Sequence, residues 1–214
     1  MFVRRESFKE YLRYYPVTSA LIAINVILLI VMEIYGSSQN VWTLLQFGAI
    51  YKLTGIVDPE WWRYVTPIFL HGGVAHLLFN SFGLIVFAPP LERMLGKWRY
   101  IACYLFSGII GNIVSWHLHQ SDFIGVGASG AIYGIYAAYI YLALFRKDIM
   151  DDSSRKTIGT IVIIGIIYSV VPFNNVDVWA HLGGFMGGFA FMAMVVWSIK
   201  RRYRKSQHAD SSEA

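Results

Sequence analysis

The chain has 214 residues, of which 56% are hydrophobic and only 14% are charged, and its mean hydropathy is +0.49. Soluble domains carry about 25% charged residues, and roughly a third of the surface of their unfolded chains stays exposed after folding. This composition therefore argues against a cytosolic globular enzyme, a disordered chain and a nucleic-acid-binding module. It predicts an all-α polytopic membrane protein.

Six windows without charged residues are long enough to cross a bilayer, which takes a helix of about 20 residues. They are Tyr14–Met32, Tyr64–Leu91, Tyr100–Ser121, Phe123–Phe145, Thr157–Val176 and Val178–Ile199. The first window lacks a small-residue cleavage site after it and is interpreted as a retained span rather than a signal peptide. The sequence thus predicts an N-terminal segment over 1–15, a six-helix domain over 16–199, and a basic and then polar tail over 200–214.

Two features modify this simple pattern. In the first loop, 36–63, the polar run Gly36–Asn40 precedes an apolar stretch, Val41–Tyr51, that is too short to span. We expect this loop to lie partly embedded at the membrane surface. Further along, Pro89 and Pro90 predict the end of the second span, because proline cannot continue a helix without losing a hydrogen bond.

The basic residues alternate between the segments that flank the windows. Of the 18 Lys and Arg residues, alternate segments hold 16 and 2, and the sparse set contains only Lys52 and Arg63. The positive-inside rule places both termini in the cytoplasm. The net charge of +5 is therefore a topology signal, and no nucleic-acid partner is expected.

Polar residues at membrane depth are costly and are candidates for function. Ser129 lies near the start of the fourth window and His181 near the start of the sixth, so both should lie near the outer face. Serine with histidine is a pair suited to acyl transfer, since a serine hydroxyl needs a base to take its proton. His76 and Asn80 are four residues apart on one helical face and can point at one oxyanion. The backbone N–H groups around Gly127 can contribute to the same site.

The neighbours of Ser129 and His181 are small. Gly127 and Gly130 flank Ser129, while Gly184 shares a helical face with His181. Small residues let two membrane helices approach closely, as a direct serine–histidine contact between helices requires. Taken singly, each of these residues is more often explained by helix packing, so it is their joint placement that indicates a site.

Three other interpretations of the sequence are less well supported. Asp177, four residues before His181, suggests a catalytic triad, but we expect it to cap the sixth span or face solvent. His117 and His119 with His71 are candidate metal ligands, yet no carboxylate stands at ligand spacing, so no metal is expected. A transporter is disfavoured because there is no repeated half-structure and no charged residue at mid-span.

Five short motifs occur together and in order along the chain. They are Trp62-Arg63, the segment from His71 to Asn80, Leu91-Glu92, Gly127-Ala128-Ser129-Gly130 and Ala180-His181-Leu182-Gly183-Gly184. In this combination the chain resembles the rhomboid intramembrane serine proteases over all six windows. One departure is Met94, where many members carry arginine two residues after the glutamate; here the arginine is Arg93.

The resemblance implies a role for each matching residue. Ser129 would be the nucleophile and His181 its general base, with Asn80 and His76 at the oxyanion. Tyr133 would flank the imidazole, and the site would be lined by Gly127, Gly130 and Gly184.

The resemblance also implies the setting of the reaction. The substrates would be transmembrane proteins cut near the outer leaflet of a bacterial plasma membrane, with the lipid bilayer as surroundings and no cofactor. The fifth span would be the mobile side through which substrates enter. The alternative is a catalytically inactive rhomboid-like protein that binds or chaperones other membrane proteins. The sequence carries no prediction of oligomeric state.

Overall fold

The computed structural model describes residues 2, 6–55, 58–170 and 176–212, and this part of the chain is mostly helical. Its helices are α1 (Phe8–Tyr14), α2 (Pro16–Tyr35), α3 (Val41–Phe47), α4 (Val74–Leu95), α5 (Lys97–Leu118), α6 (Ser129–Phe145), α7 (Asp152–Val170) and α8 (Val178–Ser212). The two strands are β1 (Ile50–Lys52) and β2 (Phe123–Gly125), and two 3₁₀ helices are η1 (Trp61–Tyr64) and η2 (Thr66–Phe69). The prediction of a helical polytopic protein is confirmed.

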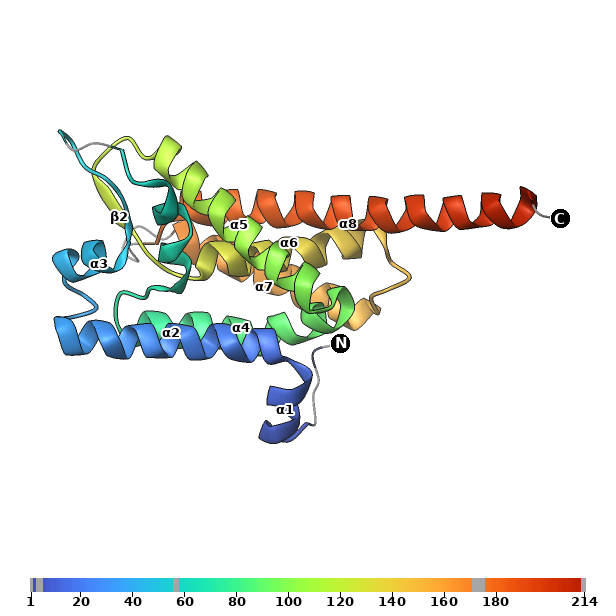
Figure 1. Ribbon diagram of the computed structural model, residues 1–214, viewed down its shortest axis with the longest axis horizontal. Helices are drawn as coiled ribbons and strands as arrows, with labels where there is room; N and C mark the ends of the chain where they lie inside the picture. Colours follow the sequence, from blue (N-terminus) through green and yellow to red (C-terminus); the bar gives the residue numbers. More distant parts are fainter. Residues whose placement is uncertain (1, 3–5, 56–57, 171–175, 213–214) are drawn as a thin grey trace.

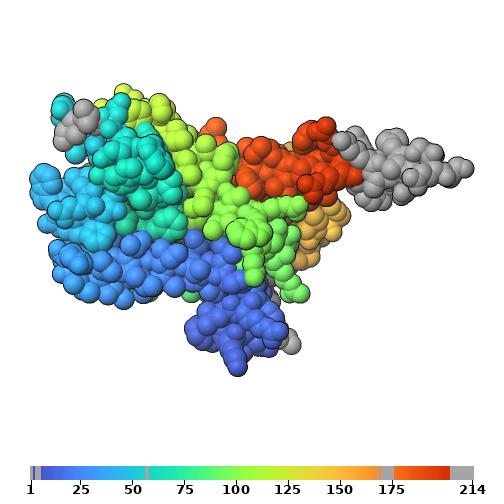
Figure 2. Space-filling model, viewed as in Figure 1, coloured from blue at the N-terminus to red at the C-terminus, as the bar shows by residue number. Residues whose placement is uncertain are grey.

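The long helices form a bundle in which α8 packs against both α5 and α6, and α2 lies beside α4 (Figure 1). The beginning of α2 and the far end of α8 point toward the same end of the bundle, whereas α3 and the strands lie at the other end (Figure 1). The tail continues α8 as a helix to Ser212 and extends well past the other helices. In the space-filling view, the first loop packs beside the end of α2, at the end of the bundle opposite this extension (Figure 2).

Among the described residues, four helices are long and apolar enough to cross a membrane. They fall on four of the six predicted windows: α2, α4, α5 and the first 25 residues of α8. The helix α6 is apolar but has only 17 residues. The helix α7 starts before the window Thr157–Val176, and residues 171–175 of that window lie outside the described residues. The number of spans therefore stays a prediction.

The prediction that Pro89 and Pro90 end the second span is wrong. The helix α4 passes through both prolines and ends only at Leu95, before Gly96. A membrane helix can continue through prolines where side chains and local adjustments satisfy the carbonyl groups that lose an N–H of the helix, here those of Ile85 and Val86. In this turn the Tyr139 hydroxyl donates to the Phe87 carbonyl oxygen at 2.7 Å.

The turn beyond the prolines is held by Glu92, which is only 2% exposed. Its carboxylate accepts hydrogen bonds from the backbone N–H groups of Val17 and Thr18, both at 2.9 Å, and from the Thr18 hydroxyl at 2.7 Å. The first N–H groups of a helix have no partners within the helix. Glu92 thus caps the N-terminus of α2 from the end of α4 and ties the first two long helices together.

We expect Glu92→Ala to lower the free energy of unfolding by about 3 kcal/mol, because hydrogen bonds to a charged group are lost and buried N–H donors are left unpaired. Thermal or detergent-induced unfolding of the purified protein measures this change. Glu10→Ala is the matched control, since it removes an exposed carboxylate that caps only α1 and should cost about 1 kcal/mol or less. Equal losses in the two variants would contradict the assignment of Glu92.

The first loop folds as a compact unit rather than an extended linker. Asn40 caps α3 by accepting from the N–H groups of Trp42 at 2.9 Å and Thr43 at 3.3 Å. Gly48 ends the helix with φ +103°, a left-handed conformation that favours glycine. The apolar stretch Val41–Tyr51 is therefore a two-turn helix followed by a strand, as its length requires.

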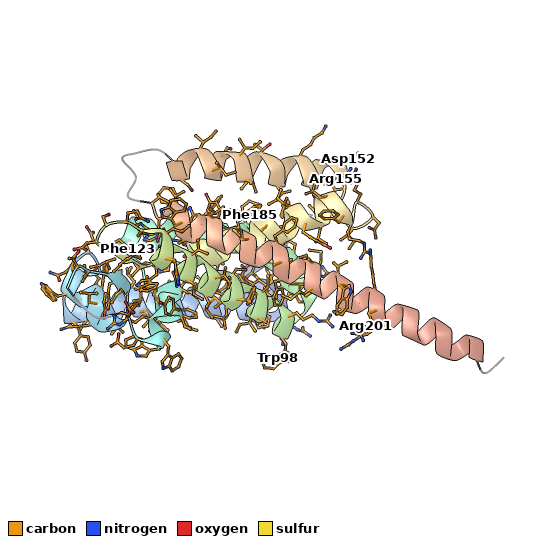
Figure 3. The ribbon with its side chains drawn as sticks, turned by 90° about the horizontal axis from the view of Figure 1, so that it is seen from above. Trp98, Phe123, Asp152, Arg155, Phe185 and Arg201 are labelled. Carbon is orange, nitrogen blue, oxygen red and sulfur yellow. The ribbon has the colours of Figure 1, made fainter. Side chains whose placement is uncertain are left out.

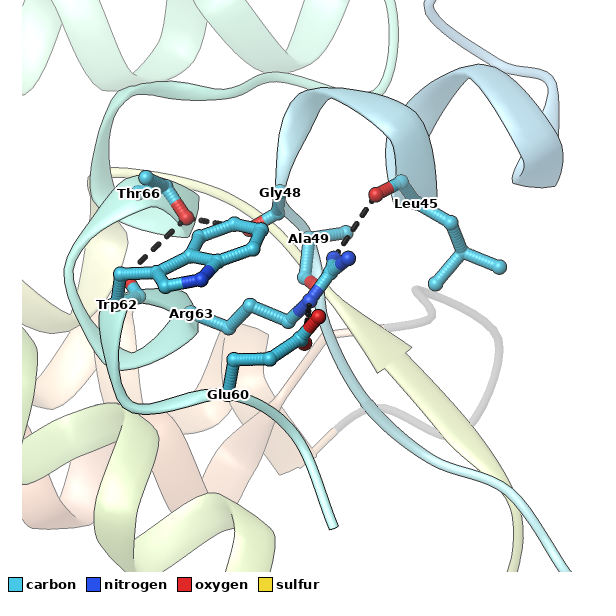
Figure 4. A network of polar contacts seen from close by, with 7 residues as sticks. All are labelled: Leu45, Gly48, Ala49, Glu60, Trp62, Arg63 and Thr66. Carbon is cyan, nitrogen blue, oxygen red and sulfur yellow. Dashed lines mark hydrogen bonds and ion pairs between the residues drawn. The ribbon is translucent and has the colours of Figure 1, made fainter. Parts of the chain in front are cut away.

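Arg63 holds this unit together (Figure 4). Its guanidinium donates to the carbonyl oxygens of Leu45 at 2.8 Å and Ala49 at 3.0 Å. It also forms an ion pair with Glu60 and lies over the Trp62 ring. One carbonyl group lies in the last turn of α3 and the other just after its end, so the Trp62-Arg63 motif fixes the short helix against η1.

The strands connect this loop to the segment before α6. They pair antiparallel, with Ile50 opposite Gly125. Nearby, the Asp122 carboxylate accepts from the Thr54 hydroxyl at 2.7 Å and the Thr54 N–H at 2.8 Å, and these hydrogen bonds hold its pKa below the usual range. The window Phe123–Phe145 is thus only partly helical, because its first residues form a strand and a loop.

Candidate active site

Ser129 is the first residue of α6, so its backbone lies where helical N–H groups have no partners within the helix. The chain reaches it through Gly127, whose φ is +132° and whose N–H donates to the Pro67 carbonyl oxygen at 2.9 Å. A β-carbon on Gly127 would lie 2.8 Å from His76 Nε2 and 3.7 Å from Ser129 Oγ. Gly127 therefore leaves room for the His76 ring beside Ser129.

His181 lies in the first turn of α8 and is buried, with 7% exposure. Its ring stacks on the Tyr133 ring, with centroids 4.0 Å apart and planes 12° apart. The Nδ1 atom is 2.7 Å from the Ser169 hydroxyl of α7. The imidazole is thus held on one face by α6 and at one nitrogen by α7.

Glycines bring the turns that carry Ser129 and His181 together. A β-carbon on Gly184 would overlap the Gly130 carbonyl oxygen, and one on Gly130 would be 3.2 Å from the Ala180 carbonyl oxygen. The backbones of α6 and α8 are therefore in direct contact one residue from Ser129 and one residue from His181. The contact predicted between small residues on these two segments is present.

The remaining predicted residues lie on α4. The His76 ring packs edge-on against the His71 ring, with centroids 5.2 Å apart, and it is close enough to His181 for the two imidazoles to interact electrostatically. Asn80 is buried one turn further along, and its amide donates to the His76 carbonyl oxygen at 3.1 Å. An amide NH₂ carries a second hydrogen, which leaves Asn80 able to donate once more.

Asp177 caps the start of α8, as the sequence predicts. Its carboxylate accepts from the Ala180 N–H at 2.9 Å and from the Ser115 hydroxyl at 2.5 Å, which caps the start of α8. Of the three histidines considered as metal ligands, His117 and His119 have local partners. His117 Nδ1 is 2.8 Å from the Ile113 carbonyl oxygen, and the His119 ring stacks on Phe123. Across the described residues, no three Cys, His, Asp or Glu side chains are grouped to hold a metal.

One residue at this site was missed in the sequence. Ser169 lies in the fifth window and is only 6% exposed, yet its hydroxyl contacts His181. The one feature of the sequence that could have indicated Ser169 as a site residue is its polarity within a predicted span. A serine that bonds its own helix gives the same signal, so sequence alone could not single it out.

Comparison with known proteins finds similarity to rhomboid proteins. A model of the Rhomboid domain matches residues 58–198. The Bacillus subtilis rhomboid protein YdcA is 40% identical over 203 residues, which cover 95% of this chain and the whole of the relative. The rhomboid protease GluP of the same organism is 39% identical over 175 residues, 80% of this chain but 33% of GluP. The rhomboid-type serine protease 2 of Emericella nidulans is 33% identical over 139 residues, 65% of this chain and 28% of the relative.

Apolar helices long enough to cross a membrane, together with relatives that are named rhomboid proteases, define a multi-pass membrane serine protease. The chain belongs to the rhomboid family of intramembrane serine proteases.

Proposed function

We propose that the protein is an endopeptidase that cleaves transmembrane segments of other membrane proteins near the outer leaflet, with Ser129 and His181 as a catalytic dyad. The observation that carries this proposal is the buried His181 ring, which stacks on Tyr133 of the helix that begins with Ser129, where the backbones of α6 and α8 are in direct contact. A neutral imidazole has one nitrogen with a hydrogen and one with a lone pair, so His181 can act as a base through Nε2 when the hydrogen is on Nδ1.

In the proposed reaction, His181 Nε2 takes the Ser129 proton while the Ser129 Oγ attacks the scissile carbonyl carbon. The resulting oxyanion is stabilised by the Ser129 backbone N–H, by the Asn80 amide and by His76. The protonated His181 then gives its proton to the leaving amine, and the C–N bond breaks to leave an acyl-serine. Water, activated by the same imidazole, hydrolyses this ester and restores the serine.

The activity is tested with the purified full chain in proteoliposomes that also contain single-span reporter proteins. We expect the wild-type protein to cut within or beside the reporter's span, and we expect no cut with Ser129→Ala. Mass spectrometry of the products identifies the bond. No cleavage by folded wild-type protein, across reporters that differ in span sequence, would favour the inactive binding or chaperone alternative.

Asn80→Ala is expected to lower kcat by about 10²- to 10³-fold, the range found when a single oxyanion donor is removed. The KM should change little, because the donor acts on charge that develops during the reaction. The matched control is Asn25→Ala, which removes a buried amide of α2 near Tyr104 and should keep kcat within a few-fold. A loss at Asn80 no greater than at Asn25 would assign the oxyanion to backbone N–H groups alone.

We also propose six spans in a plasma membrane, with both termini cytoplasmic and the site open toward the outer side. The charge distribution supports this orientation, as does the placement of the beginning of α2 and the end of α8 toward one end of the bundle.

Fusions to two reporter proteins test this topology. Alkaline phosphatase is active only outside the cytoplasm, and green fluorescent protein exported through the general secretory route does not fluoresce. Fusions after Arg202 should fluoresce, and insertions between Thr54 and Gly55 should show phosphatase activity. The reverse pattern would overturn the topology.

A further inference from the structure

The Ser169 hydroxyl lies at the meeting point of three helices. Its oxygen is 2.7 Å from His181 Nδ1 on α8, 2.7 Å from the Tyr133 hydroxyl on α6 and 2.8 Å from the Gly165 carbonyl oxygen on its own helix, α7. The side chain is buried, as is His181. Figure 3 shows α7 as a separate element along the edge of the bundle. Ser169 therefore links this edge helix to the imidazole of His181 on α8.

The direction of each of these hydrogen bonds follows from counting protons. A serine hydroxyl has one hydrogen to donate and two lone pairs with which to accept. The Gly165 carbonyl oxygen can only accept, so the single hydrogen of Ser169 goes to it. The other two contacts must then be accepted by Ser169, which means that the Tyr133 hydroxyl donates to it and that His181 Nδ1 carries a hydrogen.

This assignment fixes the tautomer of the neutral imidazole. With the hydrogen on Nδ1, the lone pair is on Nε2, and only a nitrogen with a lone pair can take a proton from a serine. In catalytic triads the group that holds Nδ1–H in this way is a buried carboxylate. Here the neighbouring carboxylate, Asp177, is bonded to the Ala180 N–H and the Ser115 hydroxyl at the start of α8.

We propose that Ser169 is a positioning residue for His181: it accepts the Nδ1–H hydrogen bond and so holds the imidazole in the tautomer whose Nε2 can act as the base. This inference rests on the proposed function of Ser129 and His181. The Gly165 carbonyl group sets the direction of the Ser169 hydroxyl. The contact between Ser169 and His181 also depends on α7 staying beside α8.

Gly165 and Tyr133 complete the arrangement. A β-carbon on Gly165 would lie 2.8 Å from the Tyr133 hydroxyl oxygen, so glycine at this position lets that hydroxyl reach Ser169. The Tyr133 ring meanwhile packs flat on His181. One tyrosine therefore contacts the imidazole by its face and the residue that holds Nδ1 by its hydroxyl.

The test uses the full chain with ¹⁵N-labelled histidine in proteoliposomes, at a pH well above the ordinary histidine pKa of about 6.5. Nitrogen resonances distinguish a ring nitrogen that carries a hydrogen from one that does not, and the His181 signals are those lost in His181→Asn. We expect Nδ1–H in the wild-type protein. In Ser169→Ala we expect a shift toward Nε2–H, together with a fall in kcat of about 10- to 100-fold and little change in KM.

Two further variants separate positioning from packing. Ser169→Thr keeps the hydroxyl and should restore both the Nδ1–H signal and most of kcat. Thr160→Val removes an exposed hydroxyl from the same helix and should change neither. Should Ser169→Ala not fold, Ser169→Cys takes its place, since a thiol is a weaker hydrogen-bond acceptor than a hydroxyl and should weaken the Nδ1–H preference.

The inference is overturned if wild-type His181 carries its hydrogen on Nε2. It is also overturned if Ser169→Ala keeps both the wild-type tautomer and the wild-type kcat. The ¹⁵N resonances that report the tautomer of His181 do not depend on turnover of a substrate. If the wild-type protein shows no cleavage that depends on Ser129, the proposed function is refuted. The hydrogen bond between Ser169 and His181 is then still tested by the ¹⁵N resonances.

Discussion

Replacing Ser129 with alanine is expected to lower the rate of reporter cleavage by at least about 10⁴-fold, because the atom that attacks the carbonyl carbon is removed. The substitution deletes one oxygen from a half-buried residue at a helix start, so the free energy of unfolding should stay within about 1 kcal/mol of the wild type. The rate is measured in proteoliposomes at a fixed ratio of reporter to lipid, and the stability by thermal unfolding.

His181→Ala should reduce the rate to a similar level, since a serine without its base is poorly reactive. The double variant should be no slower than either single variant, because the two residues act as one unit. Additive losses, or a Ser129→Ala protein that still cleaves at more than about a hundredth of the wild-type rate, would contradict the assignment of the dyad.

Gly184→Ala is expected to lower the free energy of unfolding by more than about 3 kcal/mol, an effect at the upper end for overpacked sites. The added methyl group would overlap the Gly130 carbonyl oxygen, which is backbone and cannot rotate away. Separation of α6 from α8 would also move Ser129 away from His181, so cleavage should be lost in the protein that remains folded. Detergent-induced unfolding and the cleavage rate measure the two effects.

The matched control is Gly159→Ala on α7, where an added β-carbon meets no atom within 4 Å. In a helix the same substitution at an open position should raise the free energy of unfolding by about 0.5–1 kcal/mol. Similar effects at the two glycines would mean that the close contact between α6 and α8 does not contribute to stability.

Much of the fold could be predicted because membrane helices follow from a local property. A long apolar run must form a helix in a bilayer, where every backbone polar group needs a partner. The helices α2, α4, α5 and α8 therefore fall on predicted windows. The apolar stretch Val41–Tyr51, too short for a span, forms a short helix and a strand, and its position at the membrane surface stays a prediction.

The parts that were not predicted depend on partners distant in sequence. The course of α4 through Pro89 and Pro90 accompanies contacts from Tyr139 and from the N-terminus of α2 to Glu92. The strand Phe123–Gly125 exists because β1 pairs with it. No local pattern reports such pairings, and an uncharged window does not distinguish a strand from the first turns of a helix.

At the site, the pattern in the sequence located residues but not the bonds between them. Spacing placed Ser129 and His181 at similar depth, and the glycines indicated where their helices meet. It did not indicate that Nδ1 of His181 is bonded to Ser169, because this contact joins α7 to α8 across segments that no motif connects. Roles at the site remain proposals, and chemical labelling addresses them most directly.

The most direct measurement maps the covalent adduct of a fluorophosphonate probe on the purified full chain in proteoliposomes. The probe reacts with activated serines, and mass spectrometry of the digested protein identifies the residue that carries it. We predict an adduct on Ser129 in the wild-type protein and no adduct at that position in His181→Ala. An adduct on another residue, or equal labelling of Ser129 without His181, would contradict the proposed dyad.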